Sequence, residues 1–117
     1  NMNKLKYSII YGVIRPEISE QLSLGLIIVD GDKVNVRYSN EKLNALQSLY
    51  TPSEYEFVHR VMESLSSGNV IQSTDTINYL TRYSNNLIAV SSLQDIDLDS
   101  SQESQDWLYR NYVYAGV

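Results

Sequence analysis

Residues 22–38 read LSLGLIIVDGDKVNVRY, and this stretch decides which fold the sequence predicts. The even-numbered residues from Leu22 to Ile28 are all leucine or isoleucine. Because side chains alternate along a strand, these residues are expected to share one face, with the odd-numbered residues from Ser23 to Val29 on the other. The stretch therefore begins with a predicted strand that carries apolar side chains on both faces.

The predicted strand ends at a tight turn. Asp30-Gly31 is a favoured two-residue hairpin turn, because both residue types tolerate positive φ. Beyond the turn, polar and apolar residues alternate from Lys33 to Tyr38. This alternation predicts another strand with one solvent-facing side, at an edge of the sheet.

An apolar segment upstream supplies a neighbour for this hairpin. Nearly every residue from Tyr7 to Ile14 is apolar or aromatic, which indicates a central strand covered on both faces. Arg15-Pro16-Glu17 ends it, since proline lacks the backbone donor that a ladder needs. The connection is too short for the dozen or more residues of a parallel crossover, so the sheet is expected to be antiparallel.

The rest of the chain is predicted to be mainly helical. Thr51-Pro52-Ser53-Glu54 is a capping box with proline at the first helical position, so a helix is expected to begin there. A shorter helix is predicted over Ser73–Tyr83 and a fourth strand over Leu87–Val90. A second capping-box pattern, Ser100 with Glu103, precedes a last predicted helix.

These elements predict an α+β fold: an antiparallel sheet of three to five strands with helices packed on one face. The chain has 117 residues, of which 43% are hydrophobic and 20% charged, so residues 1–117 are expected to form one domain around one core. There are no cysteines for disulfides or thiolate metal sites. With no long apolar run and no signal-peptide pattern, a cytoplasmic location without membrane contact is predicted.

Charge and motif content argue against nucleic-acid binding and catalysis. The net charge of -5 repels phosphate backbones, and the glycines are too scattered to form a phosphate loop. His59 is the only histidine, and a boundary or surface role is expected for it rather than that of a base. The acidic stretch 95–99 resembles a calcium loop but lacks its glycine and glutamate. No catalytic residue, metal or cofactor is predicted.

The aromatic residues suggest an interaction surface instead. The chain has ten tyrosines and one phenylalanine, and tyrosine, tryptophan and arginine supply most energetic anchors at interfaces. The last helix is expected to bury a stripe containing Trp107, Leu108 and Tyr112. Tyr109, Arg110 and Tyr114 cannot all join that stripe, so these three are the predicted partner-binding residues, with another protein as the partner and the oligomeric state left open.

An alternative site lies at the ends of the first two strands. Arg15 and Glu20 flank their connection, so antiparallel pairing would bring the two side chains together, with Arg37 nearby. The alternatives are a surface ion pair and a polar pocket that serves a small enzyme or ligand-binding module.

The sequence resembles a family of uncharacterised bacterial proteins known as domain of unknown function thirty thirty-seven. Tyr7 with Arg15-Pro16 resembles the family's opening strand, and the segment 20–28, EQLSLGLII, resembles its second motif with Ser23 in place of asparagine. The segment 107–113, WLYRNYV, resembles its closing helix. The resemblance implies a fold but no established activity.

The same resemblance implies a partner. Members of that family are often encoded beside kinases that resemble the toxin of Hip-type toxin–antitoxin systems. The expected function is therefore that of a noncatalytic interaction or regulatory protein, such as an accessory partner of a Hip-type toxin-like kinase.

Overall fold

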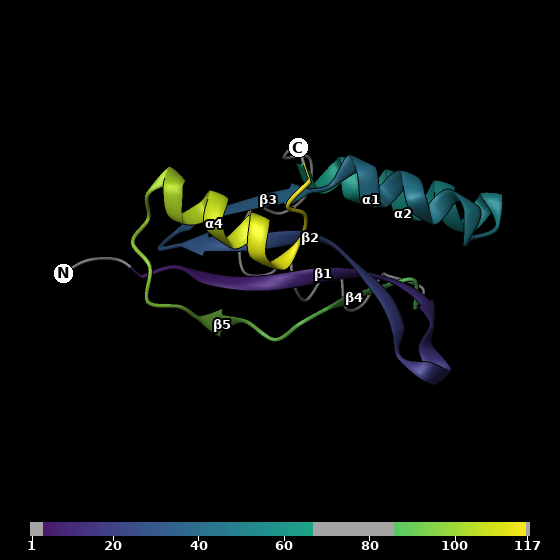
Figure 1. Ribbon diagram of the computed structural model, residues 1–117, viewed down its shortest axis with the longest axis horizontal. Coiled ribbons are helices and arrows are strands. Elements are labelled where there is room, and N and C mark those ends of the chain that lie inside the picture. The colour runs from purple at the N-terminus through teal and green to yellow at the C-terminus, as the bar shows by residue number, and fades with distance from the viewer. Residues whose placement is uncertain (1–3, 67–85, 117) are drawn as a thin grey trace.

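The computed structural model describes residues 4–66 and 86–116, and these residues form an antiparallel sheet flanked by helices (Figure 1). The order of strands in the sheet is β3-β2-β1-β4, and β5 pairs with β1 beside β4. This arrangement confirms the predicted α+β class. The strands are β1 (Lys6–Arg15), β2 (Glu20–Asp30), β3 (Lys33–Tyr38), β4 (Ile88–Val90) and β5 (Gln94–Asp95).

Two tight connections join the first three strands. The 3-10 turn η1 (Pro16–Ile18) links β1 to β2 and ends at Ser19, which has a φ of 56°. In the second hairpin Asp30 pairs with Lys33, so the turn residues are Gly31 and Asp32, one position later than predicted. Gly31 has a φ of 61°, a left-handed conformation that glycine adopts at little cost.

Because of a β-bulge in β2, some residues of this strand point to the side of the sheet opposite to the one predicted. Ile10 pairs with Gly25 and Tyr11 pairs with Ser23, which leaves Leu24 as the extra residue. Leu24 consequently packs in the same core as Ile27 rather than with Leu26 and Ile28. The prediction that the even-numbered residues of β2 share one face was therefore wrong.

Besides the 3-10 helix η1, four helical segments are described: α1 (Asn40–Ala45), η2 (Leu46–Ser48), α2 (Pro52–Ser66) and α4 (Gln102–Tyr112). The predicted capping box is confirmed, since the Glu54 amide donates to Thr51 Oγ1 at 3.3 Å and the Thr51 amide to Glu54 Oε1 at 2.9 Å. The N-cap of α4 is Ser101 rather than Ser100. The helix predicted over Ser73–Tyr83 lies outside the described residues.

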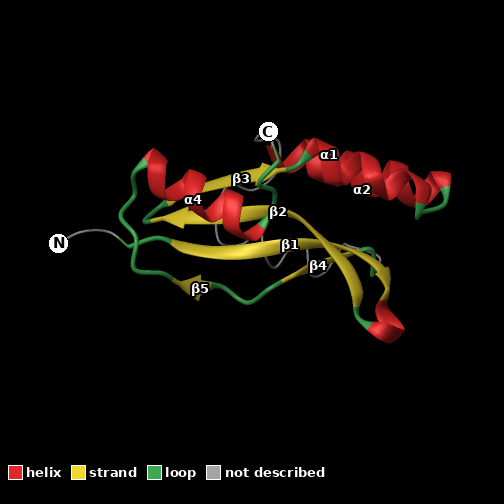
Figure 2. Cartoon of the chain, viewed as in Figure 1, coloured by secondary structure: helices red, strands yellow, loops and turns green. Residues whose placement is uncertain are grey.

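Helices cover both faces of the sheet, so the expectation of helices on one face was wrong (Figure 2). The physical reason is β2, which presents apolar side chains to both sides and therefore needs two covers. The first core joins β2 to α1 and α2, and the second joins it to α4. The buried residues of the second core are Leu5, Leu26, Ile28, Leu108 and Val113.

Tyr50, which lies just before α2, hydrogen-bonds to strand β1 and makes the stability of the fold sensitive to alkaline pH. Its hydroxyl donates to the Val13 carbonyl oxygen at 2.8 Å, and burial raises its pKa from the ordinary value of 10.0 to about 12. Between these two pH values the unfolded chain ionises first, so Tyr50 contributes stability below pH 10 that is lost as the pH rises toward 12.

We expect urea unfolding to show a steeper loss of stability between pH 10 and 12 in the wild type than in Tyr50→Phe. At neutral pH the substitution should cost about 1 kcal/mol, because the Val13 carbonyl loses its donor. Equal slopes for the two proteins over that pH range would show that Tyr50 ionises as freely in the folded state as in the unfolded chain.

Candidate interaction surface on helix α4

Local hydrogen bonds fix the start of α4. The Ser101 hydroxyl oxygen accepts from the Ser104 amide at 3.1 Å. Asp99 then accepts from the Ser101 amide at 3.1 Å and from Ser104 Oγ at 2.7 Å, and these hydrogen bonds hold its pKa below the usual value. The carboxylate also lies where the helix dipole favours negative charge. The helix therefore begins at one well-defined position.

The inner side of α4 forms the second core, with an aromatic row at its border. Leu108 is fully buried, and the Tyr112 ring stacks on Tyr7 with centroids 5.0 Å apart. The Trp107 indole meets the edge of Tyr112 at 6.2 Å, yet Trp107 remains 41% exposed. The prediction that Trp107 lies in the buried stripe was therefore wrong.

Arg37 attaches α4 to the edge strand. Its Nη1 lies 2.8 Å from Asp106 Oδ1, and its guanidinium carbon lies 4.4 Å from the centre of the Tyr109 ring. The hydrogen bond from Arg37 lowers the pKa of Asp106, and burial raises the pKa of Tyr109. A contact of this kind combines an ion pair with a cation–π interaction. The side-chain contacts of Arg37, a residue of β3, are thus with α4. They are not with the strand-end site, where the sequence analysis placed this residue.

The outward face of α4 differs from the predicted set of three residues. Arg110 is exposed, whereas Tyr109 and Tyr114 are half-buried against the second core. At 100° per residue, Glu103, Trp107 and Arg110 fall within about 60° of one another around the helix axis. All three are exposed. We call these three residues the outer surface of α4.

Trp107 is the residue that sequence reasoning missed. Its spacing from Glu103 and Arg110, four and three positions, is that of one helix face and could have indicated an outward position. Its hydrophobicity pointed the other way. The core beneath α4 is small and already filled by Leu108 and Tyr112, so the indole lies at its border.

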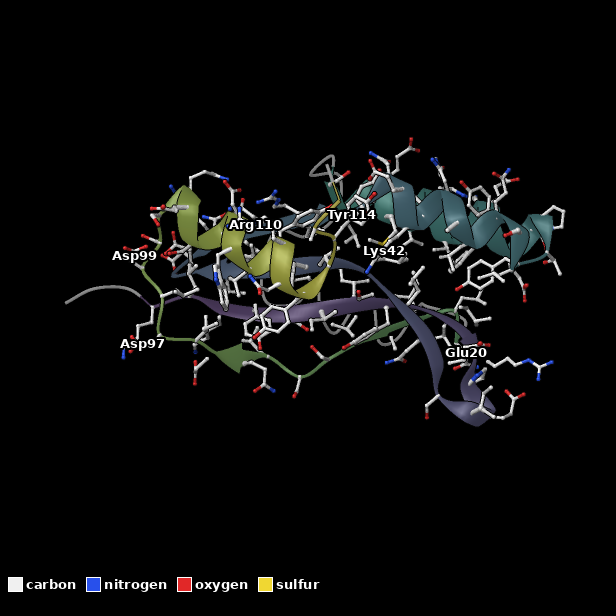
Figure 3. All side chains as sticks on the ribbon, viewed as in Figure 1. Glu20, Lys42, Asp97, Asp99, Arg110 and Tyr114 are labelled. Carbon is white, nitrogen blue, oxygen red and sulfur yellow. The ribbon has the colours of Figure 1, made fainter. Side chains whose placement is uncertain are left out.

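The alternative site at the strand ends contains Arg15 and Glu20 but lacks Arg37, the third residue predicted for it. Arg15 pairs with Glu20 in the β1–β2 register, as expected, but within the described part of the chain no ion pair joins their side chains. Arg37 pairs with Leu26, near the middle of β2, and its side chain contacts α4. Figure 3 shows that Glu20, at the strand-end site, is far from Arg110 on α4. A hollow of about 570 Å³ lies beside this end, lined by Val13, Pro16, Ser19, Gln21, Asn86, Ile88, Ala89 and Val90.

Lys42 makes a polar contact between α1 and the sheet. Its Nζ donates to Ser23 Oγ at 2.8 Å, next to the bulge in β2, and burial lowers its pKa. Both side chains are half-buried. The hydroxyl partly replaces the water that the ammonium loses on burial, so this contact helps to fix α1 at the end of β3.

Another, smaller hollow of about 380 Å³ lies along α2 and includes His59. The imidazole Nδ1 is 4.0 Å from a Glu63 carboxylate oxygen, and the ring lies 5.8 Å from the Tyr55 ring. In residues 4–66 and 86–116 no cluster of three or more histidine or acidic side chains is arranged to hold a metal ion. The His59 side chain is half-buried, at a boundary between the helix and solvent.

Comparison of the chain with family models, with curated proteins and with solved structures finds no match. The resemblance to the domain of unknown function thus stays a prediction. No helix in the described segments is both long enough and apolar enough to cross a lipid bilayer.

Proposed function

We propose that this chain is a noncatalytic interaction or regulatory protein that binds another protein through the outer surface of α4. The observation that carries the proposal is Trp107, a large apolar side chain 41% exposed on a helix whose other outward residues are polar. Tryptophan and arginine are enriched among the residues that dominate binding energy, and here Trp107 and Arg110 lie one turn apart. The surface thus offers an apolar anchor beside a cation.

The attachment of α4 supports this role because it fixes the helix before any partner arrives. The buried Leu108 holds one side and the Arg37–Asp106 ion pair at 2.8 Å holds the other. A surface held in its binding conformation loses less entropy on association than a mobile one. The indole is also positioned by its edge contact with Tyr112.

We expect Trp107→Ala to weaken binding of the partner by about thirtyfold, the effect of losing about 2 kcal/mol at an interface anchor. The partner is first isolated by cross-linking from a photoreactive residue at the exposed position 111, beside the outer surface of α4, and is then titrated against purified variants. Leu49→Ala is the control, since Leu49 is the 55% exposed C-cap of η2, a segment that packs in the first core rather than in the core beneath α4. Equal affinities for the wild type and Trp107→Ala would contradict the proposal.

The partner suggested by the family resemblance is a Hip-type toxin-like kinase. Direct titration of such a kinase with the wild type and Trp107→Ala tests this finer proposal. Binding that depends on Trp107 supports it, and the absence of binding removes the kinase as the partner while leaving the surface itself in place.

The hollow at the strand ends favours a second candidate function, that of a ligand-binding module. Its described lining is mainly apolar with a few amide and hydroxyl groups, a composition typical of sites for small, largely neutral molecules. Gln21 and Asn86 supply the polar groups, while Arg15 and Glu20 stand beside the hollow.

A screen of small fragments by nuclear magnetic resonance tests this candidate. If the hollow binds ligands, shifts should concentrate at Gln21 and Ala89, and Ala89→Leu should reduce the affinity at least tenfold by filling the space. Ala45→Leu, the same change at an exposed position of α1, is the control. Fragments that bind both variants as well as the wild type would exclude this site.

A further inference from the structure

We propose that the outer surface of α4 takes a second copy of this chain, with the two α4 helices packed antiparallel about a two-fold axis that passes near Trp107. This inference rests on the proposed function of that surface and adds that the chain itself can occupy it. Two-fold dimers are the commonest oligomers, and their interface uses the same patch on both subunits. A patch of this kind must be complementary to itself.

The charges of the outer surface have that self-complementarity. Glu103 and Arg110 are exposed, and neither forms an ion pair within 4.0 Å of a described residue. Arg110 is nevertheless close enough to Asp106, one turn earlier, to add to the lowering of that carboxyl's pKa that Arg37 chiefly causes. They are seven positions apart, which is about 10.5 Å along the helix axis, so they cannot pair with each other within one helix. In an antiparallel pair centred between them, each Glu103 faces the Arg110 of the other copy.

The same centre brings the apolar anchors together. The midpoint between positions 103 and 110 falls at positions 106 and 107, so the two exposed Trp107 indoles would meet at the axis and exclude water from each other. Asp106 lies at the same level, but its carboxylate is held on the sheet side by Arg37 at 2.8 Å and by Gln102 at 3.0 Å. The negative charge of Asp106 is therefore neutralised within its own chain, which reduces its repulsion of the Asp106 carboxylate in the other copy.

The size of the surface sets the strength to expect. α4 has 11 residues and is about 16 Å long, so a helix pair buries less than the roughly 1,200 Å² typical of stable complexes. Association should accordingly be weak, with a dissociation constant between about 10 µM and 1 mM. The dimer is expected at high local concentration, where it would compete with any other partner of the same surface.

Sedimentation equilibrium of the full chain over a wide concentration range tests the proposal with charge reversals. We expect reversible dimers in the wild type and at least a tenfold weaker association in Glu103→Arg and in Arg110→Glu. The double variant Glu103→Arg/Arg110→Glu should restore dimers, because both interchain pairs form again with their charges exchanged. Glu56→Arg and Arg60→Glu, on exposed positions of α2, repeat each change in net charge and should dimerise like the wild type.

Two outcomes would overturn this inference. A wild type that stays monomeric at millimolar concentration excludes the second copy as the partner. Dimers that persist in both single reversals, or that the double variant fails to restore, exclude the antiparallel arrangement. Neither result removes the proposed function, which fails only if the isolated partner binds the wild type and Trp107→Ala equally well.

Discussion

Gly25→Ala should destabilise the fold by about 3 kcal/mol, placing it among the most damaging single changes available in the chain. A Cβ atom at position 25 would lie 2.4 Å from the backbone carbonyl oxygen of Arg37 and 2.9 Å from Tyr38 Cβ. Both atoms belong to the backbone or the first side-chain carbon of β3, so no side-chain rotation can relieve the contact. The strand itself must shift, and with it the pairing of Gly25 with Tyr38.

Gly12→Ala is the matched control, because this glycine also lies in a central strand. There the nearest atoms are the terminal carbons of Leu46 at 2.9 Å and Leu24 at 3.1 Å, which can move by changing rotamer. We expect a loss of about 1 kcal/mol or less for Gly12→Ala. Urea denaturation of both variants gives the comparison, and equal losses would show that β3 accommodates the added methyl as easily as the leucine side chains do.

Local signals allowed much of the backbone to be predicted from the sequence. The capping box at Thr51 and the edge strand from Lys33 to Tyr38 each depend on residues a few positions apart, and each formed as expected. The face of that strand predicted to meet solvent is only partly exposed, because Arg37 lies against Tyr109 and Asp106 of α4. The pairing of Arg15 with Glu20 followed from the shortness of their connection. Such features depend on the conformational propensities of neighbouring residues and on the geometry of short connections, so a short stretch of sequence is enough to predict them.

The bulge at Leu24 and the arrangement of α4 could not be predicted in the same way. A bulge shifts the register by one residue, and only the fit of β2 against both of its neighbours decides where the shift occurs. Tyr109 was among the predicted partner-binding residues, but Arg37, 72 positions earlier in the chain, lies over its ring. Side-chain partners that come from distant segments carry no periodic signal in the sequence.

Leu108→Ala should cost about 3 kcal/mol, the typical loss when a fully buried leucine leaves a cavity. Leu108 has no exposed surface and is one of the two buried residues, with Val113, that α4 and its C-terminal end contribute to the second core. That core has few members, so its remaining side chains have little freedom to fill the space. The expected loss is therefore concentrated at the attachment of α4 to the sheet.

Hydrogen exchange measured beside urea denaturation should separate this local effect from a general one. In Leu108→Ala the amides of α4 are expected to exchange faster relative to those of α2, since the two helices pack on different cores. Leu49→Ala removes the same atoms from a side chain that is 55% exposed and should change stability by less than about 0.5 kcal/mol. If Leu108→Ala loosened α2 as much as α4, the two cores would unfold as one unit, and α4 would have no local stability of its own.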